Sequence, residues 1–169
     1  MIMDMNIKTQ IEQDICRIEE LLRTEIFNTD NISNPLRRSA FTEMFIHLAD
    51  LLKKCEIYSS RISFTDDVII TPEVKDITDL VINVRNALCH ISSNNHMIKN
   101  TNLVITNNVV RGKGILFKSG DIVVASDYDD DICYCFGNLK LYFKRHIIRA
   151  FREAKQELLP LISHDRTRR

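Results

Sequence analysis

The residues with the clearest chemical potential lie in one short run, Val84-Arg85-Asn86-Ala87-Leu88-Cys89-His90. Arginine keeps its charge at physiological pH and presents a planar fork of donors that fits a phosphate or a carboxylate. A histidine imidazole titrates close to neutral pH, so it can take up or release a proton during a reaction. Arg85 and His90 together would therefore suit a reaction at a negatively charged group.

The apolar spacing around this run predicts a helix, which would place its polar side chains on one stripe. Because an α-helix turns by about 100° per residue, Asp79, Asn83, Asn86 and His90 share one face, and Arg85 lies at its border. Such a stripe can be plain solvated surface. Asparagine is a poor helix former, however, so two asparagines and a histidine on one face favour hydrogen bonding to a ligand.

The order Arg85, Asn86 and then His90 resembles the signature of the HEPN superfamily, an Arg followed by a small polar residue and, a few positions later, a His. In HEPN proteins this motif lies toward the end of the third helix of a four-helix bundle, and inserts often precede the last helix. The motif resemblance covers six residues, Arg85 to His90. The other histidines are interpreted as core, loop or surface residues without a role: His47, His96, His146 and His164.

The resemblance implies an endoribonuclease that needs neither metal nor cofactor and leaves a 2′,3′-cyclic phosphate. In that chemistry His90 would accept the 2′-OH proton or protonate the leaving oxygen, and Arg85 would hold the scissile phosphate. Asn86 would orient His90 or the phosphate. One histidine does not readily serve both sides of a phosphate, so the resemblance also implies a C2 homodimer whose two motifs form one active site at the subunit interface.

Further candidates for RNA contact are Asn83 and the arginines of the predicted last helix. Arg145, Arg149 and Arg152 follow one another at helical spacing, so they would share a face and could hold the RNA backbone. The family context suggests a toxin, abortive-infection or phage-defence protein, and HEPN toxins often pair with a nucleotidyltransferase-type antitoxin. Two alternatives stay open: a non-catalytic HEPN-like dimer that serves as a binding or partner module, and an unrelated helical adaptor.

The elements around these residues predict a mainly α fold. Amphipathic patterns predict helices over residues 5–27, 34–58, 71–92 and 138–161, with Thr71 as the cap and Pro72 as the first residue of the third helix. Residues 101–136 are rich in β-branched residues and predict a small antiparallel meander. We therefore expect an up-and-down four-helix bundle with a β insert between the third and fourth helices.

Length and composition fit one globular domain over residues 1–161, followed by a basic tail over 162–169. The chain has 169 residues, and its 23 Lys and Arg balance its 23 Asp and Glu. The 5 Cys are scattered and odd in number, which predicts reduced thiols rather than a disulfide framework or a zinc site. No signal peptide or membrane span is expected, so the predicted location is the cytoplasm.

Overall fold

The computed structural model describes residues 4–31, 33–90 and 92–163. The chain forms two compact units, one of Met1–Ser63 with Ala150–Arg169 and the other of Phe64–Arg149. Of the basic tail expected over 162–169, the residues from 164 onward lie outside the described part.

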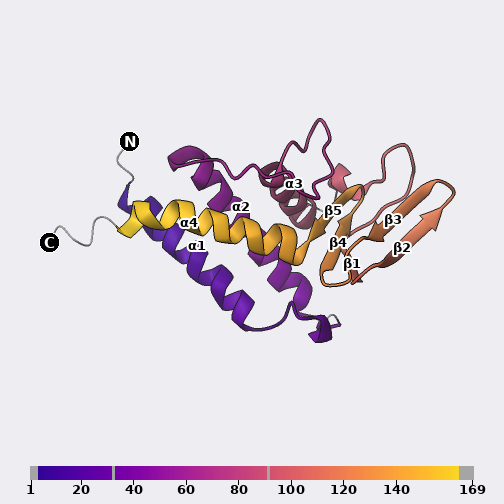
Figure 1. Ribbon diagram of the computed structural model, residues 1–169, viewed down its shortest axis with the longest axis horizontal. Helices are drawn as coiled ribbons and strands as arrows, with labels where there is room; N and C mark the ends of the chain where they lie inside the picture. Colours follow the sequence, from indigo (N-terminus) through magenta and orange to yellow (C-terminus); the bar gives the residue numbers. More distant parts are fainter. Residues whose placement is uncertain (1–3, 32, 91, 164–169) are drawn as a thin grey trace. The chain divides into compact units, whose positions relative to one another are not determined.

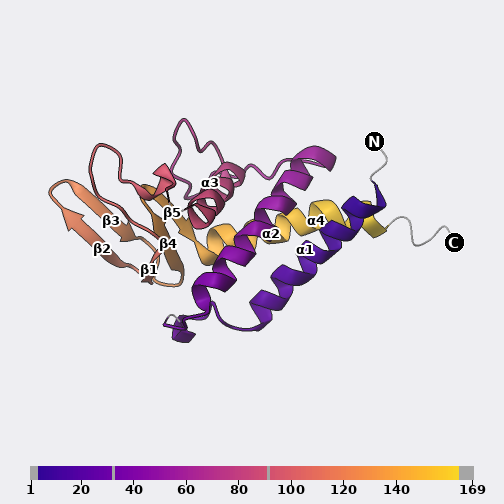
Figure 2. The ribbon, with the colours of Figure 1, turned by 180° about the vertical axis from the view of Figure 1, so that it is seen from behind.

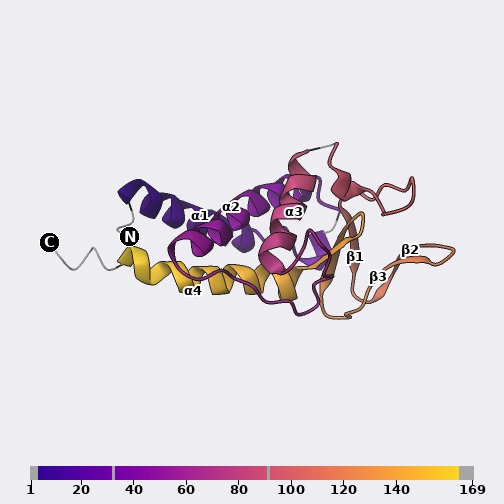
Figure 3. The ribbon, with the colours of Figure 1, turned by 90° about the horizontal axis from the view of Figure 1, so that it is seen from above.

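The first unit is helical and contains α1 (Met5–Arg23), α2 (Arg37–Tyr58) and α4 (Arg149–Ser163), with a short 3₁₀ turn, η1, at Thr29–Asn31. Helix α1 begins where the Asp4 side chain accepts the Asn6 N–H at 3.0 Å, an N-terminal cap. Its buried isoleucines recur at helical spacing, and α1 packs against α2 (Figure 1). Lys155 of α4 pairs with Glu19 of α1, and Figure 3 shows α4 below α1 and α2 in that view.

A buried polar network also joins α1 and α2. Asp14 is only 7% exposed and lies 2.7 Å from His47 Nδ1 and 2.8 Å from Lys54 Nζ. Burial raises the pKa of the Asp14 carboxyl, while the hydrogen bonds from Lys54 and His47 act in the opposite direction. Because Lys54 is also buried, each charge compensates the other in a place where an isolated ion would be costly.

The second unit combines one helix with two small sheets (Figure 2). Its elements are α3 (Ile77–Cys89), the 3₁₀ turn η2 (Asn94–His96), β1 (Asn108–Arg111), β2 (Gly114–Ser119), β3 (Ile122–Ser126), β4 (Ile132–Phe136), β5 (Leu139–Tyr142) and the π-helical segment η3 (Phe143–Ile148). The three-stranded antiparallel sheet has the order β1-β4-β5, and β2 pairs with β3 in a separate hairpin. All five residues of β4 are buried, so this central strand forms the core of the unit.

Helix α3 begins later than its sequence pattern predicts. Thr71 does not cap it; its hydroxyl accepts the N–H groups of Glu73 and Val74 and closes a tight turn. The cap is Asp76, whose side chain accepts the Asp79 N–H at 3.0 Å, while Asp79 reaches back to the Lys75 N–H. The Asp76 side chain satisfies one free donor of the first helical turn, and the Asp79 side chain holds the residue before the cap, which explains why the helix begins at Ile77.

The expected up-and-down four-helix bundle with a single β meander was wrong. Helix α3 belongs to the second unit together with the strands that follow it, and α4 closes the chain in the first. The strands form two sheets because β1 pairs with β4, which leaves β2 and β3 to pair with each other. The last helix also starts later than expected, since residues 139–142 form strand β5 instead of a first helical turn.

A buried carboxylate determines how the chain leaves β5. Asp131 is 3% exposed and accepts backbone N–H groups from Ile132, Lys144 and Arg145 at 2.8 to 3.1 Å. It therefore caps the start of η3, where unpaired donors gather. Within η3, the buried His146 accepts the Tyr142 N–H through Nδ1 at 3.1 Å and donates from Nε2 to the Asp66 carbonyl at 3.0 Å.

Candidate functional site

The motif run lies at the C-terminal end of α3. The apolar side of this helix is buried in the second unit: Ile77, Leu80, Val81, Val84 and Ala87. Arg85 and Asn86 are half-buried, and His90 is exposed. The helix thus places the three predicted catalytic residues within its last turns and keeps the His90 side chain accessible.

His90 is the C-terminal cap of α3, and its backbone is held from both sides. Its N–H donates to the Asn86 carbonyl at 3.0 Å, and its own carbonyl accepts the Ser93 N–H at 3.0 Å. The same carbonyl lies 3.3 Å from His96 Nε2, which must be the donor because a carbonyl oxygen only accepts. The structure therefore fixes the backbone of His90 and leaves the residue exposed to solvent.

His96 is a supporting residue that the sequence interpretation passed over. It is 7% exposed, and its Nδ1 finds no hydrogen-bond partner among the described residues. Its carbonyl accepts the Ile105 N–H at 2.8 Å, which ties the segment after His90 to the chain that leads into β1. No spacing rule connects a histidine in a loop to the helix before it, so only the folded chain reveals this contact.

The side chains of Arg85 and Asn86 form no hydrogen bond or ion pair with any residue in the described ranges. A half-buried guanidinium keeps its full charge and its five donors. Since neither side chain has a polar partner among the described residues, the donors of both are available to a ligand or to a second subunit.

The arginines expected to contact RNA are placed differently. Arg145 pairs with Asp130 at 2.9 Å and with Asp131 at 3.1 Å, and its guanidinium lies 3.7 Å from the centre of the Tyr128 ring. Arg149 pairs with Asp66 at 2.9 Å, a hydrogen bond that lowers the pKa of the Asp66 carboxyl. These two arginines therefore serve the fold of the second unit.

Arg152 is exposed on α4 in the first unit, whereas Arg145 lies in the π-helical segment. A π-helix has a wider turn than an α-helix, so the spacing of Arg145, Arg149 and Arg152 does not define one α-helical face. The structure does not bring these three side chains together within one unit. Their contact with RNA stays a prediction.

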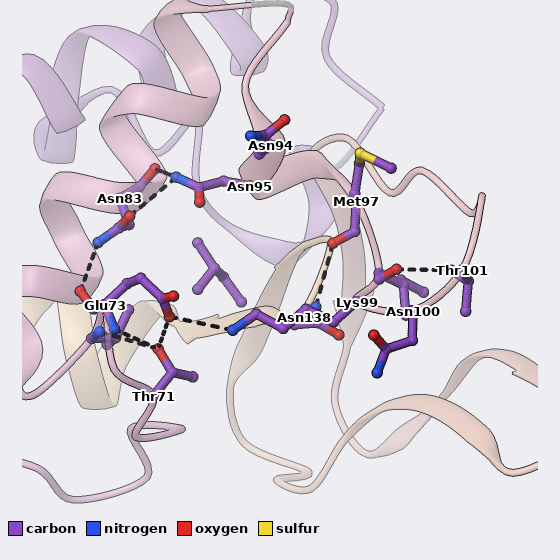
Figure 4. Close-up of a pocket in the computed structure, with 13 residues that line it drawn as sticks. Thr71, Glu73, Asn83, Asn94, Asn95, Met97, Lys99, Asn100, Thr101 and Asn138 are labelled. Atoms are coloured by element: carbon purple, nitrogen blue, oxygen red, sulfur yellow. Dashed lines mark hydrogen bonds and ion pairs between the residues drawn. The ribbon is translucent and has the colours of Figure 1, made fainter.

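A pocket of about 430 Å³ lies beside α3 in the second unit (Figure 4). Asn83, a member of the predicted polar stripe, forms part of its wall. Asn95 Nδ2 donates to the Asn83 carbonyl at 2.9 Å and to Asn83 Oδ1 at 3.2 Å. These hydrogen bonds hold the turn η2 against helix α3. The remaining lining residues are Thr71, Glu73, Val74, Asn94, Met97, Ile98, Lys99, Asn100, Thr101, Asn138 and Leu139.

Only one of the pocket's asparagines, Asn83, was singled out from sequence. Asn94 and Asn95 come shortly after the motif, but their spacing gave no sign of a ligand site. Asn138 lies in the turn between β4 and β5, more than forty residues away along the chain, and donates to the Met97 carbonyl at 3.3 Å. The pairing of β4 with β5 brings it to the pocket.

Two thiols of the second unit lie close together. Cys133 and Cys135 are buried in β4 with their sulfur atoms 3.8 Å apart. Within the described ranges, no three His, Cys, Asp or Glu side chains gather in a way that would hold a metal ion. None of the helices in those ranges has both the length and the apolar character needed to cross a bilayer.

Comparisons with known proteins add no relative. Searches against protein-family models, curated proteins and solved structures gave no significant match. The features of this chain that bear on function are therefore the residues of α3 and the pocket beside it.

Proposed function

We propose that this protein is a metal-independent endoribonuclease in which Arg85, Asn86 and His90 form the active centre. The observation that carries the proposal is the contrast among its arginines. Arg145 and Arg149 are paired with carboxylates, whereas Arg85 has no partner among the described residues and precedes the exposed His90 by five residues at the same helix end. Cleavage of a phosphodiester requires both an available cation and a titratable group.

The proposed reaction needs no group beyond the chain and its substrate. The 2′-oxygen of RNA attacks phosphorus, the new P–O2′ bond forms and the P–O5′ bond breaks. One His90 takes the proton from the 2′-OH, and a second His90 supplies a proton to the leaving 5′ oxygen. Arg85 binds the non-bridging oxygens, where negative charge grows in the transition state.

Two histidines on opposite sides of one phosphate call for two copies of the chain. We infer a C2 homodimer in which the ends of two α3 helices meet across one cleft. The exposure of His90 and the lack of partners for Arg85 and Asn86 within the described chain support this arrangement.

The first test is RNA cleavage in the presence of a chelator, with analysis of the 3′ ends. We expect cyclic phosphate ends, and a loss of about 10²- to 10⁴-fold in rate for His90→Ala. Cys89→Ala is the matched control, because Cys89 is the exposed neighbour at the same helix end. A folded wild-type dimer that leaves varied RNAs intact would refute the proposal, as would equal activity in His90→Ala.

Mixing wild-type and His90→Ala subunits tests the shared site. If one site needs both histidines, a mixed dimer is inactive and activity follows the square of the wild-type fraction. A linear decrease would mean that each subunit works alone.

The biological setting follows from the HEPN resemblance. We propose a cytoplasmic role in phage defence, as a toxin or abortive-infection ribonuclease, with a nucleotidyltransferase-type protein as its antitoxin partner. The rival function is a HEPN-like dimer that binds a nucleotide without cutting RNA, and the pocket favours it specifically because it offers a cavity lined in part by Asn83 of the same helix. Nucleotide binding without cleavage would support this rival.

A further inference from the structure

The pocket and the motif share helix α3 and the segment that follows it. Asn83 lies on the same stripe of α3 as Asn86, and Asn94 and Asn95 lie four and five residues after His90, in η2. An RNA strand bound at the motif therefore has a cavity available to it within the same unit.

The pocket offers donors and acceptors that the fold does not use. Asn94 is exposed, and its amide has no partner among the described residues. Asn138 donates one N–H to Met97, which leaves its oxygen and its second N–H available to the cavity. Figure 4 shows these amides at separate points of the pocket wall. A carboxamide pairs with a neutral edge that carries a donor next to an acceptor.

Charge in the pocket is balanced. Lys99 Nζ lies 3.3 Å from Glu73 Oε2, so the lysine is already paired with a carboxylate. The hydrogen bond from Thr71 lowers the pKa of Glu73, which keeps that carboxylate charged. The Glu73 carboxylate would repel a phosphate bound in the pocket, but it would not repel a neutral polar group.

The pocket also has an apolar part. Val74 and Ile98 are buried, at 1% and 5% exposure, and Leu139 lies in the lining beside them. A ligand with an apolar face and a polar edge would contact both kinds of surface. The cavity volume of about 430 Å³ is within the range of small-molecule sites.

From these features we propose that the pocket binds one unpaired base of single-stranded RNA, next to the scissile phosphate. Bases splayed out of a single strand are read by hydrogen bonds to their edges and by contacts to their faces. The Asn94 and Asn138 amides read the edge, and the apolar part contacts the ring. This inference rests on the proposed ribonuclease function and adds to it a subsite that selects where the RNA is cut.

Equilibrium binding of short homopolymeric RNAs of adenosine, cytidine and uridine tests the subsite, in the His90→Ala background so that the probe stays intact. We expect one homopolymer to bind tightest, and Asn94→Ala and Asn138→Ala each to weaken it by about tenfold, the value of a lost base contact. Affinity for the other two should not change. Asn102→Ala is the matched control, because Asn102 is an exposed asparagine of the same loop outside the pocket lining.

The subsite would be overturned if the asparagine variants lost affinity equally for all three RNAs, or if neither variant lost affinity. It would also be overturned if Asn102→Ala lost as much affinity as they do, or if the protein bound no RNA. Circular dichroism of each variant excludes misfolding as the cause of a loss. Cleavage by the wild-type protein separates the two proposals. Cleavage with a base preference that both asparagine variants retain would refute the subsite and leave the ribonuclease. Base-selective binding without cleavage would refute the ribonuclease and leave the subsite.

Discussion

Gly137 packs against the backbone of residues 95–97, the segment that lines the pocket and contains His96, which supports His90. Its backbone has a φ of +51°, in the left-handed region, and its N–H donates to the Ile105 carbonyl at 2.9 Å. A Cβ added at this position would lie 2.6 Å from the carbonyl oxygens of both Asn95 and Met97. These atoms belong to the backbone, so no side chain can rotate away to make room.

Gly120 allows the two costs of an added methyl group to be separated. It has a φ of +57°, but an added Cβ there would meet nothing within 4 Å. Gly120→Ala should therefore lose only the left-handed preference, about 1–2 kcal/mol of unfolding free energy. Gly137→Ala carries the same cost and adds overpacking of about 1–3 kcal/mol, so we expect a total loss of about 2–5 kcal/mol.

Urea unfolding followed by far-UV circular dichroism measures both variants, with the midpoint compared at a constant slope. Gly137→Ala should also weaken the base selectivity of RNA binding, because Asn95 and Met97 must move, whereas Gly120→Ala should not. If Gly137→Ala is no less stable than Gly120→Ala, the backbone of residues 95–97 yields freely and the reasoning fails.

Two further predictions concern the start of η3. Asp131→Ala removes the acceptor of three backbone N–H groups and the buried partner of Arg145. Urea unfolding should therefore show a decrease of about 3–5 kcal/mol in the free energy of unfolding. A decrease as small as that of a surface substitution would contradict the capping role. Burial lowers the pKa of His146 below its usual 6.5, so the unfolded chain binds a proton that the folded chain does not, and stability should fall as pH drops below 6.5. His146→Gln should retain the donor and acceptor but show a smaller decrease in stability between pH 7.5 and 5.5; an unchanged pH dependence would contradict this account.

The sequence alone determined the local features of the candidate site. The apolar spacing of α3 and the polar residues between those positions depend only on helical periodicity, so the stripe that carries Asn83, Asn86 and His90 could be read from the chain. The Arg85–His90 spacing is likewise a property of the sequence. The predicted start of this helix was nevertheless wrong. Asp76, through its reciprocal contacts with Asp79, caps the helix in place of Thr71.

Tertiary structure decided what those local features meet. The pairing of β1 with β4, across the β2–β3 hairpin, depends on contacts between residues distant in sequence, which periodicity does not encode. The pairing of β4 with β5 brings Asn138 to Met97, and the buried Asp131 draws Arg145 into an ion pair. Whether an arginine is free for RNA or an asparagine lines a pocket depends on which partners folding brings within hydrogen-bonding distance, and the strand pairings of this chain set those partners.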